Sequence, residues 1–288
     1  MNKHTSWICD YNKNSGEGNL ARIYLNSLKI KDIKVINPKY KFYLSEYIYQ
    51  ILGILVLWYY YFLGKKTIYV NYLPLWNCLI FLLCPPKTIF GPITGSIQIN
   101  KIKNINSLIR AKILPIFYHL SLIILNYRQK RILFATNILK KFVNKEIKKK
   151  SVFNFIPNNY YIKINKKKTK RIFDLIVYYR KHKNKFFDHH ITYLKNQINN
   201  KKKIIIVGDK LNVKGCIYLG TVNKIKLLTI LKRTKFCLSG DDNLLSLFNL
   251  ECLMTGVKVI FNHKLKFQIS QKNQKQFKPY NYELETFL

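Results

Sequence analysis

Acidic residues are scarce in this chain. Its 288 residues include 13 Asp plus Glu against 51 Lys plus Arg, for a formal net charge of +38. Such an excess attracts polyanions, so an anionic membrane and a nucleic acid are both candidate partners. Arginine is scarce too, with seven of the 51 basic residues, and proteins that read phosphates and bases favour its planar guanidinium. Compositional drift toward Lys, Asn, Ile and Tyr is therefore the favoured source of the charge. Attraction to an anionic membrane surface is the next alternative, and nucleic acid is the least favoured partner.

The cysteine patterns of disulfide and metal sites are missing as well. The six cysteines form no CxxC pair and no cluster with histidine, so no metal site is expected. Most of them lie among apolar residues, where a free Cys is a small hydrophobe, and this fits a reducing cytoplasm. Residues 1–18 contain no long apolar stretch, so no secretory signal is expected. These features predict a cytoplasmic protein, with peripheral contact at the inner face of a membrane as a further possibility.

No apolar run reaches the length of an ordinary membrane span. The longest, residues 47–63, is just too short and includes Gln50 and Gly53. Its tyrosines and Trp58 are more typical of a buried or interfacial helix than of one that faces lipid. We expect a helix buried against a sheet, and a transmembrane helix is the alternative.

Hydrophobic residues make up 48% of the chain, and they are grouped in short runs that alternate between strand-like and helix-like patterns. Strands are expected at 5–12, 32–38, 66–74, 131–137, 174–180, 203–209, 216–220, 235–240 and 256–262. Helices are expected at 15–29, 45–63, 75–83, 107–127, 186–200 and 223–234, and in a stretch that begins near residue 239. This alternation predicts an α/β fold with parallel sheets covered on both faces.

A lysine-rich, weakly periodic stretch at residues 138–170 interrupts the alternation and is typical of a junction between domains. We therefore predict two Rossmann-like domains, residues 1–150 and 151–288, which face a cleft. Ligands of open parallel sheets bind beyond the carboxyl ends of the strands, so the loops that follow strands are the places to look for a site.

The first such loop contains Gly16 and Gly18, between an expected strand and an expected helix. Glycines allow close approach of the backbone to a ligand, and the free N–H groups at a helix start favour an anion. The spacing is not the GxGxxG dinucleotide pattern, because position 21 is Ala. An ordinary turn with a helix cap is the alternative.

The second loop follows the expected strand at 174–180. Arg180 and Lys185 lie five residues apart, and together they suit a diphosphate, because Arg binds it as a fork and Lys as a point charge. Lysine is common in this chain, so Arg180 is the more telling of the two. A solvated surface loop is the alternative.

The third stretch, SGDDNLLSLFNLECLMTG, starts at Ser239. We expect a helix that begins at about Asp241 and Asp242, since Ser and Asp are good N-caps and acids are favoured at that end. Capping alone would explain these two acids. Glu251 differs, because it lies within the apolar part of the helix, where a carboxylate is costly to bury without a partner. The hydroxyls of a ligand are a candidate partner.

Together these three stretches resemble a group-1 (family 4-like) glycosyltransferase of GT-B architecture. The spacing of Arg180 and Lys185 matches that family. The family also has a Glu on a helix followed by a Gly at the start of the next strand, and Glu251 and Gly256 match this pattern. The glycine loop matches loosely. Asp242 or Asn243 stands where the family has a first Glu, and the chain is short for this architecture.

The resemblance implies transfer of a sugar, of the hexosyl type and with retention, from a nucleotide-diphosphate sugar to a glycan or lipid-linked acceptor, as in surface polysaccharide synthesis. Arg180 and Lys185 would stabilise the leaving diphosphate, Glu251 would accept hydrogen bonds from the ribose, and the enzyme would need no metal or other cofactor. The remaining implied donor-binding residues are Ser239, Gly240, Asp242, Asn243, Gly16 and Gly18. Asn71 and Thr94, in loops of the first domain, are candidates for the acceptor side. An inactive, glycosyltransferase-like binding protein is the main alternative, and a basic nucleic-acid-binding protein is less favoured.

Overall fold

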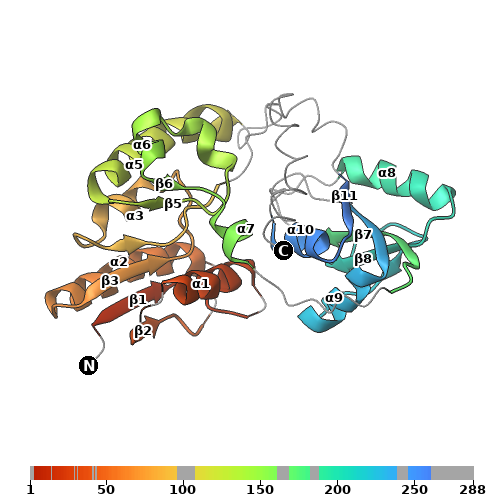
Figure 1. The fold of residues 1–288 in the computed structure, drawn as a ribbon, viewed down its shortest axis with the longest axis horizontal. Coiled ribbons are helices and arrows are strands. Elements are labelled where there is room, and N and C mark those ends of the chain that lie inside the picture. The colour runs from red at the N-terminus through yellow and green to blue at the C-terminus, as the bar shows by residue number, and fades with distance from the viewer. Residues whose placement is uncertain are drawn as a thin grey trace. The chain divides into compact units, whose positions relative to one another are not determined.

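The computed structural model divides the chain into two compact units, Met1–Tyr160 and Tyr161–Leu288, each built on a parallel sheet (Figure 1). It describes residues 3–13, 15–28, 30, 32–40, 42, 44–95, 108–160, 169–181, 188–238 and 246–260. Unit 1 extends past the predicted boundary at residue 150 because α7 (Phe155–Asn159) packs on α1 (Gly16–Ser27). The rings of Tyr24 and Phe155 meet edge to face there, with centroids 5.8 Å apart.

The main sheet of unit 1 has the strand order β2-β1-β3-β4, and all its strands are parallel. These strands are β1 (His4–Ile8), β2 (Ile33–Ile36), β3 (Lys66–Val70) and β4 (Ile89–Phe90). A second parallel pair, β5 (Ile132–Leu133) and β6 (Ser151–Val152), joins it through a bridge between Ile93 and Phe134. Buried residues fill β1 and β3 almost without alternation, as expected for strands that are covered on both faces.

The helices of unit 1 lie where the sequence predicts them, apart from the segment after residue 138. The longer ones are α1, α2 (Ser45–Phe62), α3 (Cys78–Leu83) and α5 (Leu114–Arg128), the last preceded by the π-helical turn η1 (Ile109–Ile113). The stretch predicted as a junction between domains contains, up to residue 160, the 3-10 helix η2 (Ile138–Phe142), α6 (Lys145–Lys149), β6 and α7. Asn144 caps α6 by accepting from the Ile147 N–H at 2.9 Å, and Ile147 is buried, so few apolar residues suffice to order this stretch.

Helix α2 is buried against the sheet, as the sequence predicts, but on one side only. One side packs on the sheet through Ile54 and Leu57, while Gly53 lies against the Trp7 ring, where a Cβ would come within 2.2 Å of the indole nitrogen. The opposite side of α2 is exposed, although it is apolar. Among the residues that the structure describes, no helix is both long and apolar enough to cross a membrane.

Unit 2 is a five-stranded parallel sheet of order β11-β10-β7-β8-β9 with helices on both faces (Figure 1). The strands are β7 (Phe173–Tyr179), β8 (Ile204–Gly208), β9 (Ile217–Tyr218), β10 (Thr234–Leu238) and β11 (Lys258–Ile260). The helices are α8 (Asp188–Asn199), α9 (Lys224–Lys232) and α10 (Leu247–Met254). One core cluster includes Leu231 and Cys252 of α9 and α10, and another includes Leu194 of α8. The predicted α/β class with parallel sheets is thus confirmed.

Candidate functional site

The strand order of each unit has one topological switch point. In unit 1 the chain runs from β1 to β2 on one side and then crosses to β3 on the other, so the switch lies between β1 and β3. In unit 2 the chain runs from β7 to β8 and β9, and then returns to β10 on the other side of β7. Ligands of open parallel sheets bind beyond the carboxyl ends of the strands at such points. All three stretches that the sequence singled out begin at one of these two edges.

In unit 1 the edge carries the N-terminus of α1. Ser15 caps this helix, since its hydroxyl accepts from the Gly18 N–H at 2.9 Å. A Cβ on Gly18 would lie 2.0 Å from the Asn12 carbonyl oxygen, so packing of the helix against its own loop explains this glycine. Gly16 differs, because nothing lies within 4 Å of the position where its Cβ would be. The helix start is therefore accessible at Gly16, whereas Gly18 has a structural reason to be glycine.

Asn71 follows β3 and joins the two strand ends of this edge. Its backbone is left-handed, with φ of 72°, a conformation that Asn adopts more readily than most residues. Its side-chain amide donates to the carbonyl of Asp10 at 2.6 Å and to that of Glu17 at 2.9 Å. The Asn71 side chain is 2% exposed, and its oxygen has no hydrogen-bond partner among the residues that the structure describes. Asn71 thus belongs with the glycine loop, although the sequence assigned the two to different substrates.

Thr94 lies along the next stretch of the same edge. Its N–H donates to the Leu73 carbonyl at 2.9 Å, and its carbonyl accepts from the Leu75 N–H at 3.2 Å. These bonds fix the segment after β4 to the segment after β3. The Thr94 backbone therefore has a structural role, and its half-buried side chain stays a candidate for contact with the acceptor.

Cys9, directly after β1, is not equipped to act as a nucleophile. Burial raises the pKa of its thiol to about 11, although hydrogen bonds from the side chains of Tyr69 and Trp7 oppose this rise. The thiolate, which is the reactive form, is therefore rare near neutral pH. The thiol contributes to packing of the core instead.

In unit 2 the edge begins with Arg180, the exposed residue directly after β7. The neighbouring strand end is tied to it, because the Lys181 N–H donates to the Asp209 carboxylate at 2.6 Å and the Asp209 N–H donates to the Tyr179 carbonyl at 2.8 Å. Gly208, with φ of +100°, allows this approach, since a Cβ there would lie 2.1 Å from the Tyr179 oxygen. Asp209 was not singled out from the sequence, although its place after a buried strand is a usable signal.

The other strand at this switch point is β10, whose last residue, Leu238, pairs with Val177 of β7. Residues 239–245 follow it directly in the chain. Of the predicted site residues, five lie outside the residues that the structure describes: Lys185, Ser239, Gly240, Asp242 and Asn243. The topology places the starting points of both segments side by side, and the positions of these five side chains stay predictions.

Helix α10 begins later than the sequence predicted. Its first residue is Leu247, and its N-cap is Ser246, whose hydroxyl accepts from the Asn249 N–H at 3.2 Å. The prediction that Asp241 and Asp242 cap this helix was therefore wrong, because Ser246 takes the capping position.

Glu251 lies on α10 and is 4% exposed. Its carboxylate forms an ion pair with the ammonium of Lys224, the first residue of α9. A cation at a helix N-terminus opposes the helix dipole, and a buried carboxylate needs a compensating charge, so each group offsets the cost of the other. Burial of Glu251 therefore does not by itself require a ligand. Sequence reasoning missed Lys224, which lies 27 positions before Glu251 in a lysine-rich chain.

No group of three or more His, Cys, Asp or Glu that could hold a metal ion occurs within the described parts of the chain. The residues gathered at the two edges include amides, glycines, a helix start and Arg180, together with the acids Asp10, Glu17 and Asp209. Such groups bind anions and hydroxyls.

Comparison with known proteins finds similarity among solved structures only. No protein-family model matches the chain, and no curated protein does. Among solved structures, E. coli heptosyltransferase WaaC with ADP is similar at 10% sequence identity and a TM-score of 0.34. The match covers 90% of this chain and 86% of that chain.

Proposed function

We propose that the chain is a glycosyltransferase of GT-B architecture that moves a sugar from a nucleotide-diphosphate sugar to a glycan or lipid-linked acceptor. The observation that supports this most is the switch point of unit 2, between β7 and β10. The Arg180 loop and the segment 239–245 both start there. Open parallel sheets bind nucleotides at such a switch point, and Arg180, one of few arginines in the chain, lies directly after β7 there.

In this proposal, Arg180 and Lys185 bind the diphosphate and stabilise the charge that develops as it leaves. Glu251 accepts hydrogen bonds from the ribose, since an ionised carboxylate is an acceptor and the ribose supplies hydroxyl donors. Asp242 or Asn243, with Ser239 and Gly240, contacts the donor sugar or its phosphates. The basic pair makes a metal or another cofactor unnecessary, and we propose a hexosyl donor and retention of configuration.

Unit 1 supplies the acceptor side and part of the donor contact. The start of α1 is accessible at Gly16, and N–H groups at a helix start attract anionic or hydroxyl-bearing groups. Asn71 and Thr94 lie at the same edge of the sheet. We place the reaction in the cytoplasm, in the synthesis of a surface polysaccharide.

Thermal shift with a panel of nucleotide diphosphates and nucleotide sugars tests the proposal. At least one nucleotide is expected to raise the melting temperature of the wild-type protein, because a ligand that binds only the folded state stabilises it. Arg180→Gln should remove most of this rise, while Arg131→Gln, an exposed arginine of unit 1, should not. No stabilisation by any nucleotide would rule the donor site out.

An inactive binding protein is the second candidate, and one observation favours it. At the position where the glycosyltransferase family has its first Glu, this sequence has Asp242 or the uncharged Asn243. Loss of that Glu favours a protein that binds nucleotide sugars without catalysis. Such a protein would be stabilised by nucleotide sugars. It would not release nucleoside diphosphate from them when a cell extract that contains glycan and lipid-linked acceptors is added. Release of nucleoside diphosphate at a rate that falls in Arg180→Gln would exclude this candidate.

A further inference from the structure

Helix α2 of unit 1 exposes a continuous apolar stripe. Five large side chains recur every three or four residues along one side of the helix, and each is between 61% and 77% exposed. They are Tyr47, Ile51, Leu55, Tyr59 and Phe62. Soluble proteins normally place charged or polar residues on the outer side of a surface helix. A stripe of this length therefore indicates a surface that is covered when the protein functions.

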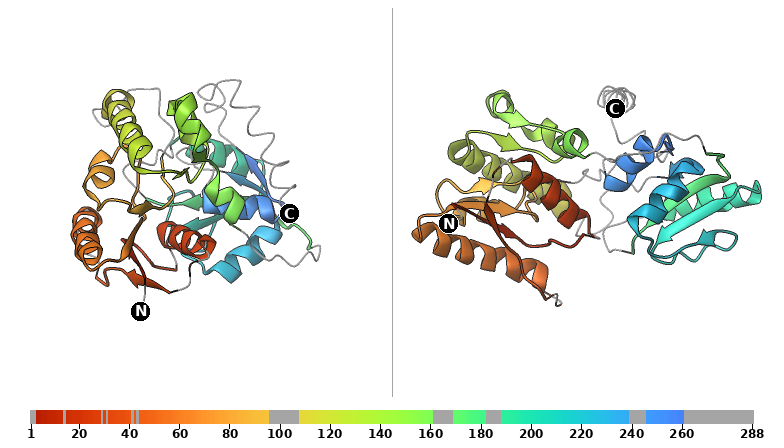
Figure 2. Two further views of the ribbon diagram at one scale, coloured as in Figure 1. Left: turned by 60° about the vertical axis from the view of Figure 1, so that its left-hand side comes forward. Right: turned by 60° about the horizontal axis from the view of Figure 1, so that its bottom comes forward.

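Two neighbouring helices extend the stripe into a broad face. Helix α5, with the turn η1 before it, exposes Ile109, Ile113, Ile116, Leu120, Ile123 and Tyr127 at helical spacing. Helix α3 exposes Leu79, Leu82 and Leu83 between them. Figure 2 (left panel) shows the three helices, from orange to yellow-green, in one row beside the sheet. We call the exposed sides of α2, α3 and α5 the apolar face.

Hydrogen bonds join the three helices that form the apolar face. The indole N–H of Trp58 on α2 donates to the Leu83 carbonyl at the end of α3, at 2.8 Å. From the other side, the Arg128 guanidinium at the end of α5 donates to the carbonyls of Leu82 and Cys84, at 2.7 and 2.6 Å. These bonds satisfy the last carbonyls of α3 and join the C-terminal ends of all three helices.

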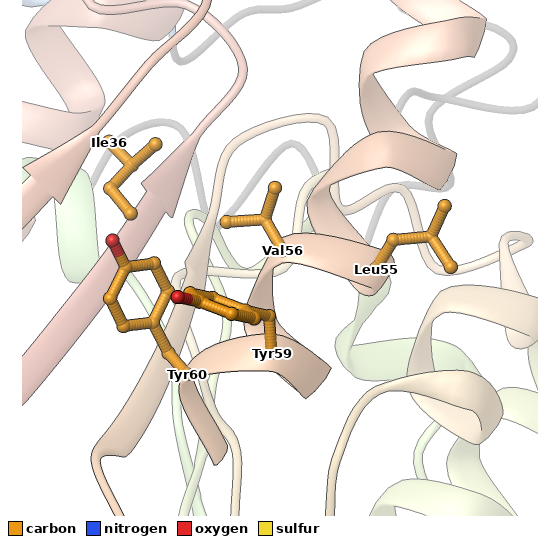
Figure 3. A pocket seen from close by; sticks show the side chains of 5 residues that line it. All are labelled: Ile36, Leu55, Val56, Tyr59 and Tyr60. Carbon is orange, nitrogen blue, oxygen red and sulfur yellow. The ribbon is translucent and has the colours of Figure 1, made fainter. Parts of the chain in front are cut away.

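A hollow of about 430 Å³ opens at one margin of the face, between α2 and the edge strand β2. It is lined by Ile36 of β2 and by Leu55, Val56, Tyr59 and Tyr60 of α2, and Figure 3 shows Tyr60 reaching from the helix toward Ile36. Beside it, the Lys34 ammonium donates to the Tyr60 hydroxyl at 2.8 Å and lies over its ring. The margin thus combines an apolar recess with a cation.

The charge around the apolar face is almost entirely positive. Glu46 lies in the first turn of α2, and the sequence then has no Asp or Glu from residue 47 to residue 145, a stretch that includes the rest of α2 and all of α3 and α5. Basic residues lie within four positions of the end of each helix: Lys65 and Lys66 after α2, Lys87 after α3, and Lys130 and Arg131 after α5. We call these five residues the basic rim. An apolar surface with such a rim is complementary to lipid tails bordered by anionic headgroups.

We infer that the apolar face docks unit 1 onto the surface of an anionic lipid membrane, with the basic rim against the headgroups. A second copy of the chain suits the face less well, since a self-paired face brings two basic rims together and the sequences of the three helices contain only one acid, Glu46. No described helix is both long and apolar enough to span the bilayer, and we place the face in the membrane interface. The inference deepens the proposed function in one respect: a lipid-linked acceptor would be met at this surface.

Flotation with lipid vesicles, in the absence of any nucleotide, tests the inference. Full-length protein should bind phosphatidylcholine vesicles with about 30% phosphatidylglycerol, bind pure phosphatidylcholine more weakly, and lose part of its binding at high salt. The variant Ile51→Gln/Leu55→Gln should bind at least about tenfold more weakly, because two exposed apolar side chains are lost. Lys66→Gln and Lys130→Gln should each weaken binding about fivefold.

Matched variants in unit 2 serve as controls. Ile225→Gln removes an isoleucine that is 79% exposed on α9, and Lys195→Gln removes an exposed lysine of α8, so neither should change vesicle binding. Failure of the folded protein to bind anionic vesicles, or unchanged binding by Ile51→Gln/Leu55→Gln, would overturn the inference. A dimer in light scattering that this variant dissociates would assign the face to a second copy instead. Nucleotide binding is measured without vesicles, and vesicle binding is measured without nucleotide. Failure of the membrane inference therefore does not affect the proposed donor site, and failure of the donor site does not affect the membrane inference.

Discussion

Replacing Lys224 with Met tests whether the ion pair with Glu251 holds α9 and α10 together. Met keeps most of the length and apolar stem of Lys, so packing changes little while the charge is lost. The Glu251 side chain is 6% exposed, and removal of Lys224 leaves its carboxylate buried without this partner ion. Lys226, exposed on the same helix, provides a matched control through Lys226→Met.

The exposure of the two partners sets the expected size of the effect. Breaking a fully buried pair costs about 3–5 kcal/mol, while an exposed pair contributes about 0–1 kcal/mol. Lys224 is 44% exposed and Glu251 is 6% exposed, which places this pair between the two limits. We expect Lys224→Met to lower the free energy of unfolding by about 2 kcal/mol. Glu251→Gln should cost about 1 kcal/mol, because the ammonium that it leaves behind can reach water.

Urea unfolding of the single variants and the double variant measures these values. The midpoint should fall without a change in slope, and the double variant should be less destabilised than the sum of the two single variants. Lys226→Met should lie within about 0.5 kcal/mol of the wild type. If Lys224→Met costs no more than Lys226→Met, or less than Glu251→Gln, then Lys224 does not compensate the buried carboxylate.

Two further predictions concern the edge of unit 1. Gly18→Ala should destabilise the protein by about 1–3 kcal/mol, because the added Cβ would clash with the Asn12 carbonyl oxygen. Gly16→Ala should be neutral or slightly stabilising, because nothing lies near its added Cβ. Thermal unfolding compares the two variants, and equal effects would contradict the packing explanation for Gly18. The thiol of Cys9, with a pKa raised to about 11, should resist iodoacetamide at pH 8, whereas the half-buried Cys78 should react. Labelling of the native protein followed by mass spectrometry measures the modification of each cysteine. Faster modification of Cys9 than of Cys78 would refute the burial of Cys9.

The alternation of strands and helices was predictable because it depends on local patterns of apolar and polar residues along the sequence. Runs such as Ile204–Gly208 are apolar throughout, short and followed by polar residues, which is what a strand covered on both faces requires. Placement of the glycine loop before α1 and of Arg180 after β7 followed from the same patterns. Their location at the two switch points depends on strand order, which the sequence does not reveal.

Other features depend on contacts that local patterns do not encode. Asp241, Asp242 and Ser246 are all acceptable caps, and only the structure identifies Ser246 as the one that starts α10. The partner of Glu251 is one lysine among many in this chain. Helix α2 is apolar on every side, so its sequence gives no sign of which side would be exposed.

Titration of Arg180→Gln and wild-type protein with nucleoside diphosphates, by calorimetry, tests the proposed donor site most directly. A hydrogen bond to a charged group contributes about 1.5–3 kcal/mol, so loss of the guanidinium should weaken binding of at least one nucleoside diphosphate by about tenfold or more. Arg131→Gln should bind it as the wild type does. Binding of equal strength in wild type and Arg180→Gln, or no binding of any nucleoside diphosphate, would contradict a nucleotide-sugar site at the switch point of unit 2.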